Sequence, residues 1–432
     1  MIYNLLMAMR VSFHSGHRRP AVPRRRVGSM AVVAGTLLGL FALLTAGCGH
    51  APTSRPTASA TAASLATVSY PACVDLLPGR SPSLPYREYR FTGNYAVDDF
   101  CDTVTVLVER MPGSPGVPVQ RVCLMSNATG RLRVVVPKTV CGQLGWVITT
   151  AHCSSRAIAW EELSPGDDLI ETVSWRLYAA LFDPKTLRLR GTTLVAQGRT
   201  DTCMRPLFDV AGNDVIWRTQ RRDAGTERGE VRMMDLTTKE TRLLATTREA
   251  YHTVSAVDGG WLVTERVGRT TPRVTLAVRD FDGRLLQAVD LANRTPLVHF
   301  PAFRDGWLAW SLEGEEESGT ELLLYLREPG GTVHMVDAAE GSEPFFCGDY
   351  LFFLTSHGDR LTPARLAVDG VYLPTLRLFT LVESTSNEED PGWQGLFGAP
   401  TATSHLVLAR AVPERDGDLV REVTRVRVYQ VR

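Results

Sequence analysis

Short apolar runs separated by polar turns recur along this chain from about residue 90 to its end. The clearest unit is residues 203–246, where two apolar runs flank a turn at Gly212 and Asn213. An Arg-rich polar loop follows, and then two alternating runs are separated by residues 237–240. Runs of this length, with period two and Gly, Asp or Asn at their ends, predict β-strands. Four such strands in succession are the size of one β-propeller blade.

The second strand of this unit has counterparts along the chain, at steps of 57, 46, 46, 43 and 55 residues. The equivalent positions are Ile158, Val215, Trp261, Trp307, Tyr350 and His405. A period near 45, with two longer steps that hold loop insertions, is typical of propeller blades. An earlier unit at residues 94–136 has the same pair of hairpins. The sequence therefore predicts an all-β propeller over residues 71–432, with seven blades; six blades is the alternative.

The last repeat ends at residues 426–431, which would be its third strand. A ring left in this state would expose an open sheet edge. We expect an N-terminal strand near residues 86–91 to supply the fourth strand and to close the circle.

The first 47 residues have the three parts of a secretory signal. Arginines including the run Arg24, Arg25 and Arg26 precede an apolar stretch at residues 30–44, and LTAG then precedes Cys48. This end resembles the bacterial lipobox, which implies that Cys48 is lipidated and becomes the first mature residue. An uncleaved membrane anchor and ordinary cleavage are the alternatives. A lipidated Cys48 would place the protein on the extracytoplasmic face of the bacterial cell membrane.

Residues 48–70 are mostly Ala, Thr, Ser and Pro, which predicts a flexible tether between the lipid and the folded body. The whole chain has 47 basic and 47 acidic residues, but residues 1–47 hold six Arg and no acid. The remainder is therefore mildly acidic, at about −6. This charge disfavours nucleic acid as a partner, because nucleic-acid binding needs a basic surface.

The repeats place a Gly/Asp turn before an aromatic-containing strand, and residues 235–244 fit D-x-x-T-x-x-x-x-x-L. These features resemble the TolB-like propellers of bacterial envelopes, over most of residues 90–432. The resemblance implies the fold. It implies no single function, because propellers of this style bind, scaffold or catalyse.

Eight cysteines are present, and an exported protein can keep disulfides. We expect the pairs Cys73–Cys101 and Cys141–Cys153, although spacing alone leaves many connectivities open. Cys347 lies in an apolar run and is expected to be a buried thiol.

Residues 145–153 (GWVITTAHC) resemble the histidine segment of trypsin-like serine proteases, in which His152 would be the general base. The Gly-Asp-Ser-Gly-Gly segment that carries the nucleophile of that family is absent from the sequence. The repeat register instead makes residues 146–151 an inner strand and aligns His152 with Asp209 of the next repeat. We assign no catalytic residue, no metal and no cofactor. Residues 280–283 and 416–418 are Asp/Gly turns, which need no calcium.

Function is expected at a mouth of the central channel, on loops between blades. Tyr251, His252, His299 and Trp393 are the candidate binding residues there. The first hypothesis is a binding or scaffold module for an envelope protein or a glycan. A propeller-based hydrolase or lyase is the alternative, and a serine protease is a remote third possibility.

Overall fold

The computed structural model describes residues 66–67, 74–110, 119–165, 172–223, 226–247, 253–257, 259–267, 273–291, 298–313, 322–336, 342–357, 365–385, 404–416 and 419–431. All regular elements among them are β-strands, as predicted. In these ranges the structure contains no helix with the length and apolar character that a membrane span requires. The leader, Cys48 and nearly all of the predicted tether lie outside the described residues.

Twenty-four consecutive strands of the described chain form six antiparallel meanders of four strands each. The first is β5 (Tyr95–Phe100), β6 (Val104–Arg110), β7 (Val119–Ser126) and β8 (Leu132–Val136). The second is β9 (Val147–Cys153), β10 (Ala157–Leu163), β11 (Ser174–Asp183) and β12 (Arg188–Arg199). The third is β13 (Leu207–Ala211), β14 (Asp214–Asp223), β15 (Thr226–Asp235) and β16 (Thr241–Thr247).

The fourth meander is β17 (Val254–Val257), β18 (Gly260–Val267), β19 (Arg273–Asp280) and β20 (Leu285–Asp290). The fifth is β21 (Val298–Arg304), β22 (Trp307–Glu313), β23 (Leu322–Arg327) and β24 (Val333–Val336). The sixth is β25 (Ser342–Cys347), β26 (Tyr350–His357), β27 (Arg365–Tyr372) and β28 (Arg377–Thr385). A three-stranded sheet follows, in the order β29 (His405–Asp416), β30 (Leu419–Gln430) and β4 (Tyr86–Thr92).

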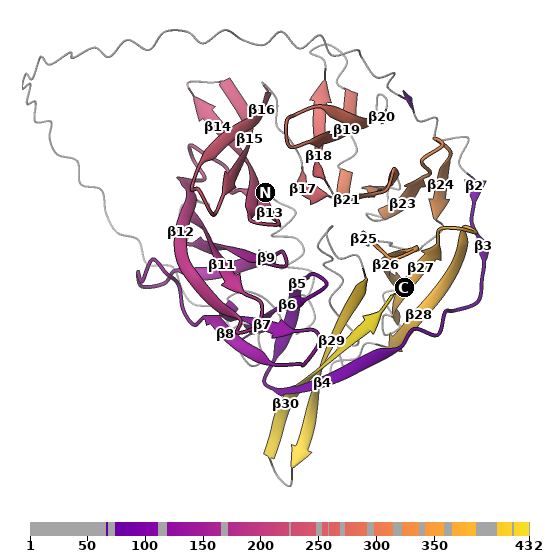
Figure 1. The fold of residues 1–432 in the computed structure, drawn as a ribbon, viewed down its shortest axis with the longest axis horizontal. Coiled ribbons are helices and arrows are strands. Elements are labelled where there is room, and N and C mark those ends of the chain that lie inside the picture. Colours follow the sequence, from indigo (N-terminus) through magenta and orange to yellow (C-terminus); the bar gives the residue numbers. More distant parts are fainter. Residues whose placement is uncertain are drawn as a thin grey trace, which may run out of the picture. The chain divides into compact units, whose positions relative to one another are not determined.

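The first strands of the six meanders surround a common centre (Figure 1). Each contacts the first strand of the next meander, from β5 through β9, β13, β17 and β21 to β25. The second strand of a meander also contacts the first strand of the next one, and β29 contacts β5 in the same way. Apart from one bridge between Val119 and Ile148, neighbouring meanders share no main-chain ladder in the described residues. Sheets arranged radially in this way are a β-propeller.

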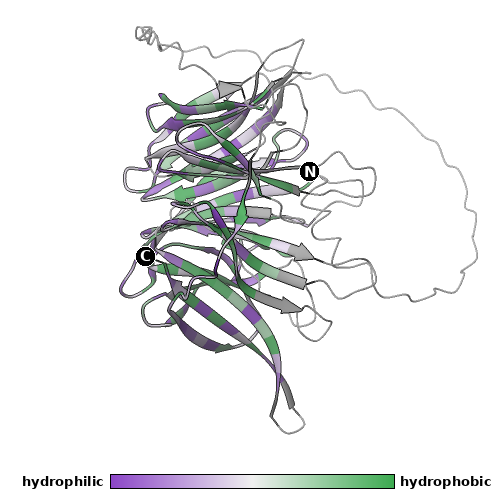
Figure 2. Ribbon diagram, turned by 90° about the vertical axis from the view of Figure 1, so that its right-hand side faces the viewer, coloured by the Kyte–Doolittle hydropathy of each residue, from purple (hydrophilic) through white to green (hydrophobic). Residues whose placement is uncertain are grey.

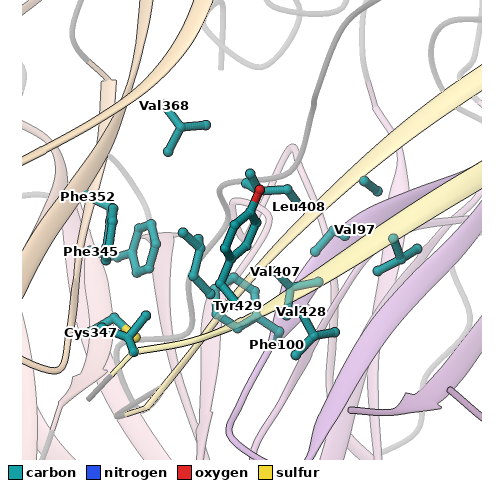
Figure 3. Packing of buried hydrophobic residues seen from close by; sticks show 14 of the residues in the cluster. Val97, Phe100, Phe345, Cys347, Phe352, Val368, Val407, Leu408, Val428 and Tyr429 are labelled. Atoms are coloured by element: carbon teal, nitrogen blue, oxygen red, sulfur yellow. The ribbon is translucent and has the colours of Figure 1, made fainter. Parts of the chain in front are cut away.

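The hydrophobic core is divided among the boundaries between neighbouring sheets. Each core cluster contains residues of adjacent meanders, such as Trp160 with Val106, or Trp310 with Leu276. Hydrophobic and hydrophilic residues interleave along the strands (Figure 2), because successive side chains point to opposite faces. Figure 3 shows the cluster in which Phe345, Val407 and Phe100 bring together the sixth meander, the three-stranded sheet and the first meander.

The turn at the centre of the predicted repeat is confirmed. Ala211 pairs with Asp214, so Gly212 and Asn213 form a two-residue hairpin loop. Gly212 has a φ of 58°, in the left-handed region that glycine adopts at little cost. The predicted second strands also begin as expected, with Val215 and Trp261 each the second residue of its strand.

The N-terminal strand that we expected near residues 86–91 is β4. It pairs antiparallel with β30, from Tyr86 opposite Tyr429 to Thr92 opposite Val423. Arg427 Nε donates to Glu88 Oε2 at 2.8 Å across this pair. The first and last parts of the folded chain are thus joined in one sheet.

Three two-residue strands precede β4. They are β1 (Ala66–Thr67), β2 (Val74–Asp75) and β3 (Leu77–Pro78), and each pairs parallel with the fourth strand of one meander: β20, β24 and β28 respectively. β1 falls within residues 48–70, the segment predicted as the tether. Pairing along these outer strands covers part of three edges that would otherwise be exposed.

We expect Gly130→Ala to destabilise the protein more than Gly212→Ala. Both glycines have positive φ, so both substitutions carry the left-handed penalty of about 1 kcal/mol. A Cβ at Gly130 would also overlap the ring of Tyr89 in β4, whereas nothing lies within 4 Å of a Cβ at Gly212. The overlap should add about 1–3 kcal/mol. Denaturant unfolding measures both; equal losses would show that β4 does not pack on the turn that contains Gly130.

Candidate functional site

Three neighbouring first strands each contribute one titratable side chain to a single cluster. Asp99 lies near the end of β5, His152 near the end of β9 and Asp209 in the middle of β13. One ligand-type atom from each of the three lies within 4.8 Å of the others. The cluster lies beside the hairpin turns that follow the first strands. The sequence analysis had predicted the functional site on the loops between blades.

A β-bulge turns two successive acids of β5 toward β9. The strand register shifts between Val97 and Asp99, which releases Asp98 from the alternation of faces. Asp98 Oδ2 accepts hydrogen bonds from the Ala151 main-chain N–H and from Thr150 Oγ1. Asp99 Oδ2 accepts from the Cys153 N–H at 2.7 Å, and its Oδ1 accepts from the Phe100 N–H at 2.8 Å.

Asp209 repeats this arrangement at the boundary between the third and fourth meanders. Its Oδ1 accepts from the N–H of Val210 at 2.7 Å, and its Oδ2 accepts from the N–H of Ala256 in β17 at 2.8 Å. Each of the two aspartates thus binds its own strand and the first strand of the next sheet. Both are carboxylates that link blades.

His152 lies between these two carboxylates. Its Nδ1 is 3.6 Å from Asp99 Oδ2, and its ring stands edge-on to Phe208 with centroids 5.0 Å apart. The side chain of His152 is 30% exposed, whereas Asp99 and Asp209 are 1% and 5% exposed. The imidazole is therefore the member of the cluster that solvent can reach.

Burial and charge act in opposite directions on this cluster. Burial raises the pKa of both Asp99 and Asp209, the latter to about 6. Burial would lower the pKa of His152, but the contact with Asp99 and the charges of Asp99, Asp209 and Asp98 outweigh it and raise that pKa to about 9. At neutral pH His152 is then an imidazolium held by carboxylates.

This protonation state decides what the cluster can do. An imidazolium cannot serve as a general base or as a metal ligand, because its ring nitrogens carry protons. A neutral His152 would complete a set of two carboxylate oxygens and one nitrogen, which a divalent cation could share. Asp99, His152 and Asp209 are the one such group among the residues described here.

The protease-like segment is a strand of the propeller. Residues 147–153 form β9, which confirms the predicted inner strand at residues 146–151. His152 also has the register position that Asp209 has in β13, because their partners Ala159 and Ile216 are equivalent positions of β10 and β14. Among the described residues, the groups that act on His152 are carboxylates and Phe208, and no serine hydroxyl is one of them. The nearby Ser154 uses its Oγ to donate to the Gly212 carbonyl at 2.5 Å.

The predicted binding residues cannot be compared with this cluster. Tyr251, His252 and Trp393 lie outside the described residues, and His299 falls in β21 with its side chain outside the description. Residues 280–283 form a hairpin turn as expected, with Asp280 Oδ1 accepting from the N–H groups of Asp282 and Arg284. The sequence did not single out Asp98 and Asp99. The available signal was an aspartate shortly before the first hairpin turn of two repeats, Asp99 in one and Asp209 in the other.

The predicted disulfides stay predictions. Cys73 lies outside the described residues, while Cys101, Cys141 and Cys153 are not joined in disulfides in the structure. The main-chain N–H of Cys141 donates to Glu162 Oε2 at 3.1 Å, and Cys153 lies against Cys101. Cys347 is buried, as expected.

A second candidate site is a pocket of about 200 Å³ between the N-terminal segment and the sixth meander. The rings of Tyr350 and Tyr372 lie 5.1 Å apart in its wall. Arg80 and Arg377, both exposed, also line it. The segment is held there by the Gly79 N–H, which donates to the Leu378 carbonyl at 2.6 Å.

No protein-family model matches this chain, and no curated protein matches it. Solved structures to which it is similar include the β-propeller domain of the Trilobed protease from Pyrococcus furiosus, at 9% identity, 78% coverage of this chain, 94% of that one and a TM-score of 0.44. An acylaminoacyl peptidase of Pyrococcus horikoshii has 10% identity, 76% and 50% coverage and a TM-score of 0.46. An oligogalacturonate lyase from Vibrio parahaemolyticus has 7% identity, 82% and 99% coverage and a TM-score of 0.42.

We expect the imidazole of His152 to titrate near pH 9 when followed by NMR. Asp209→Asn should lower this midpoint, because it removes one negative charge that holds the proton. Since the pKa of His152 is raised from 6.5, its contribution to stability is complete below pH 6.5 and is lost as pH rises through about 9. The loss should amount to about 2–3 kcal/mol in the free energy of unfolding. A titration midpoint of His152 at or below pH 6.5 would show that Asp99 and Asp209 do not hold this side chain in its protonated form.

Proposed function

We propose that this chain is a lipid-anchored extracytoplasmic propeller that binds an anionic saccharide. Lipidation at Cys48 is supported by the arginine-rich start, the apolar stretch and the small residues before that cysteine. In this proposal residues 48–65 act as the tether that holds the folded body away from the membrane.

We further propose seven blades, with β4 as the fourth strand of the last one. Pairing of β4 with β30 supports this closure, as does the contact of β29 with β5, which repeats the contact of β22 with β25. In this arrangement β29 and β30 are the second and third strands. Residues 386–403, which precede β29, lie outside the described ranges.

The pocket beside the sixth meander carries the binding proposal. The tyrosine rings offer flat apolar faces to the C–H side of a sugar ring, while the exposed arginines suit a carboxylate or sulfate, to which a guanidinium can donate two parallel hydrogen bonds. The pocket is smaller than the 300–1,000 Å³ typical of sites for whole small molecules. Its size therefore suits one sugar unit of a longer chain.

Calorimetry with the full-length protein in detergent tests this proposal. A hyaluronan tetrasaccharide, which carries glucuronate, should bind, and neutral cellotetraose should not. Arg377→Ala should weaken binding about tenfold or more, because hydrogen bonds to charged groups contribute about 1.5–3 kcal/mol. Arg188→Ala is the matched control, since Arg188 is also exposed but lies on β12, outside the pocket. Equal binding of both sugars, or an unchanged affinity in Arg377→Ala, would reject the proposal.

The anchor has its own test. Cys48→Ser should move the protein from the membrane fraction to the soluble extracytoplasmic fraction, because the modified sulfur would be missing while the secretory signal remains. Metabolic labelling with a fatty acid should mark the natural chain and not the variant. A variant that stays in the membrane fraction would indicate an uncleaved anchor.

The alternative is a hydrolase or lyase, and the convergence of His152 with two carboxylates favours it. The burial of Asp99 and Asp209, and the N–H groups that both accept, weigh against it, because a general base must reach its substrate. If the protein turns over a saccharide, His152→Gln should abolish turnover and leave the affinity of the pocket unchanged. Loss of affinity in this variant would point to a structural effect.

A further inference from the structure

We propose that Cys101 and Cys153 form a disulfide that joins the first and second blades. Cys101 directly follows β5, and Cys153 is the last residue of β9. Each cysteine was a disulfide candidate from the sequence, but with a different partner. The proposal rests on the proposed export of the chain, because an oxidising compartment is needed for the bond to form and persist.

The two sulfurs meet inside the core between these sheets. Cys101 is 2% exposed and Cys153 is fully buried, and both belong to the cluster that contains Val106 and Trp160. The side chains of Cys101 and Cys153 are within hydrogen-bond reach of each other. This proximity across the boundary between two sheets is the first requirement for a disulfide.

The main chain on both sides of the pair is fixed. The Cys153 N–H donates to Asp99 Oδ2 at 2.7 Å, and the Cys101 N–H donates to the Val104 carbonyl at 2.8 Å. Asp99 is two residues before Cys101, so the hydrogen bond and the proposed disulfide cross the same boundary side by side.

Among the described cysteines, Cys141 lies apart from this pair. Its N–H and that of Val140 donate to the carboxylate of Glu162 on β10. Cys123 and Cys347 belong to a different core cluster. Cys101 shares a core cluster with Cys153 and lies within hydrogen-bond reach of it.

The chemistry is thiol–disulfide exchange with an oxidised dithiol carrier protein of the extracytoplasmic space. Because both sulfurs are buried in the folded chain, the exchange takes place during folding, and the Cys101 thiolate attacks first. Its sulfur attacks the carrier disulfide, forms a mixed disulfide and releases one carrier thiolate. Cys153 then loses its proton and attacks the Cys101 sulfur, which releases the second carrier thiolate. Two electrons pass to the carrier, which becomes a dithiol, and the chain loses two protons.

The disulfide would fix the Asp99–His152 contact. His152 is adjacent to Cys153 in sequence, so the covalent link holds the strand ends that carry the acid and the imidazole. It also closes a loop that contains β6, β7 and β8, and cross-links of loops this long stabilise by restricting the unfolded chain.

Peptide mapping without reduction tests the pairing. The full chain is exported by a bacterial host, trapped with iodoacetamide in denaturant and digested with trypsin. Cys101 lies in peptide 91–110, while Cys141 and Cys153 share peptide 139–156. We expect these two peptides to be linked until a reductant is added. Chymotryptic cleavage after Trp146 then separates Cys141 from Cys153 and should leave the link on Cys153.

Other patterns would overturn the pairing. An internal loop within peptide 139–156 would show Cys141–Cys153, a link from peptide 91–110 to Cys73 would show the other predicted pair, and alkylation of both Cys101 and Cys153 would show no bond. A form without the leader, made in the cytoplasm and treated with oxidised glutathione, distinguishes a failure of the proposed export from a failure of the proposed pairing. A Cys101–Cys153 link that appears there but not in the host-exported chain would reject export and keep the pairing; its absence there would reject the pairing.

Thermal unfolding gives a second measurement. Cys101→Ser and Cys153→Ser should each lower the midpoint by about 5 °C, and the double variant should lose no more than either single variant. The midpoint of the natural chain should fall on reduction, whereas the variants should not respond. Cys347→Ser is the matched control: it also alters a buried cysteine, but it should keep the response to reductant. A reductant response that persists in Cys101→Ser would contradict the proposal.

Discussion

In the described residues a single main-chain bridge, Val119 with Ile148, links neighbouring meanders, so other interactions must hold the sheets together. Buried carboxylates meet this need at two boundaries. Asp99 accepts the N–H of Cys153, and Asp209 accepts the N–H of Ala256. A charged acceptor forms a stronger hydrogen bond than a neutral one, and a satisfied carboxylate can be buried at tolerable cost. The apolar clusters supply most of the packing at each boundary, while the carboxylates fix how the first strands align.

Carboxylates buried close together repel one another, and cations between them reduce this cost. His152 lies between Asp99 and Asp209, and the raised pKa of its imidazole reflects that position. Arg205 likewise neutralises the buried carboxylate of Glu161, which is 1% exposed. Its Nε donates to Glu161 Oε1 at 3.1 Å, and its Nη2 donates to Oε2. Removing either cation would leave a buried charge unpaired, which is more damaging than losing the pair itself.

The repeated strands could be predicted because their signals are local. The alternation of residues around Val215 and the turn at Gly212 depend on a few neighbouring residues, and the structure agrees with both. The pairing of β4 with β30 could also be anticipated, since an incomplete last repeat leaves an edge. The strands β1, β2 and β3 could not, because two residues paired in parallel leave no periodicity to detect.

The cluster of Asp99, His152 and Asp209 was only partly accessible from sequence. The repeat register aligned His152 with Asp209, but the role of Asp99 depends on a bulge at Asp98 that composition does not reveal. The Cys101–Cys153 contact has the same origin: it joins residues of two blades that no local signal connects. Contacts between blades depend on how neighbouring sheets pack, and a single sequence carries no local signal for that packing.

The histidine segment at residues 145–153 shows that the role of a sequence motif depends on the residues that surround it in the folded chain. Ile148, Ala151 and Cys153 are the buried residues of β9, with a register shift at Thr149 between the first two. His152 is partly exposed beside the buried Cys153, which suits the end of a first strand. A general base must be neutral near the working pH, yet carboxylates around His152 favour the charged form. The same residues that would orient a histidine for proteolysis here keep it protonated and hold two blades together. The more strongly the charges of Asp99 and Asp209 favour the protonated imidazole, the less able His152 is to accept a proton from a substrate. The same interactions that stabilise the fold at this position therefore make His152 a poorer general base.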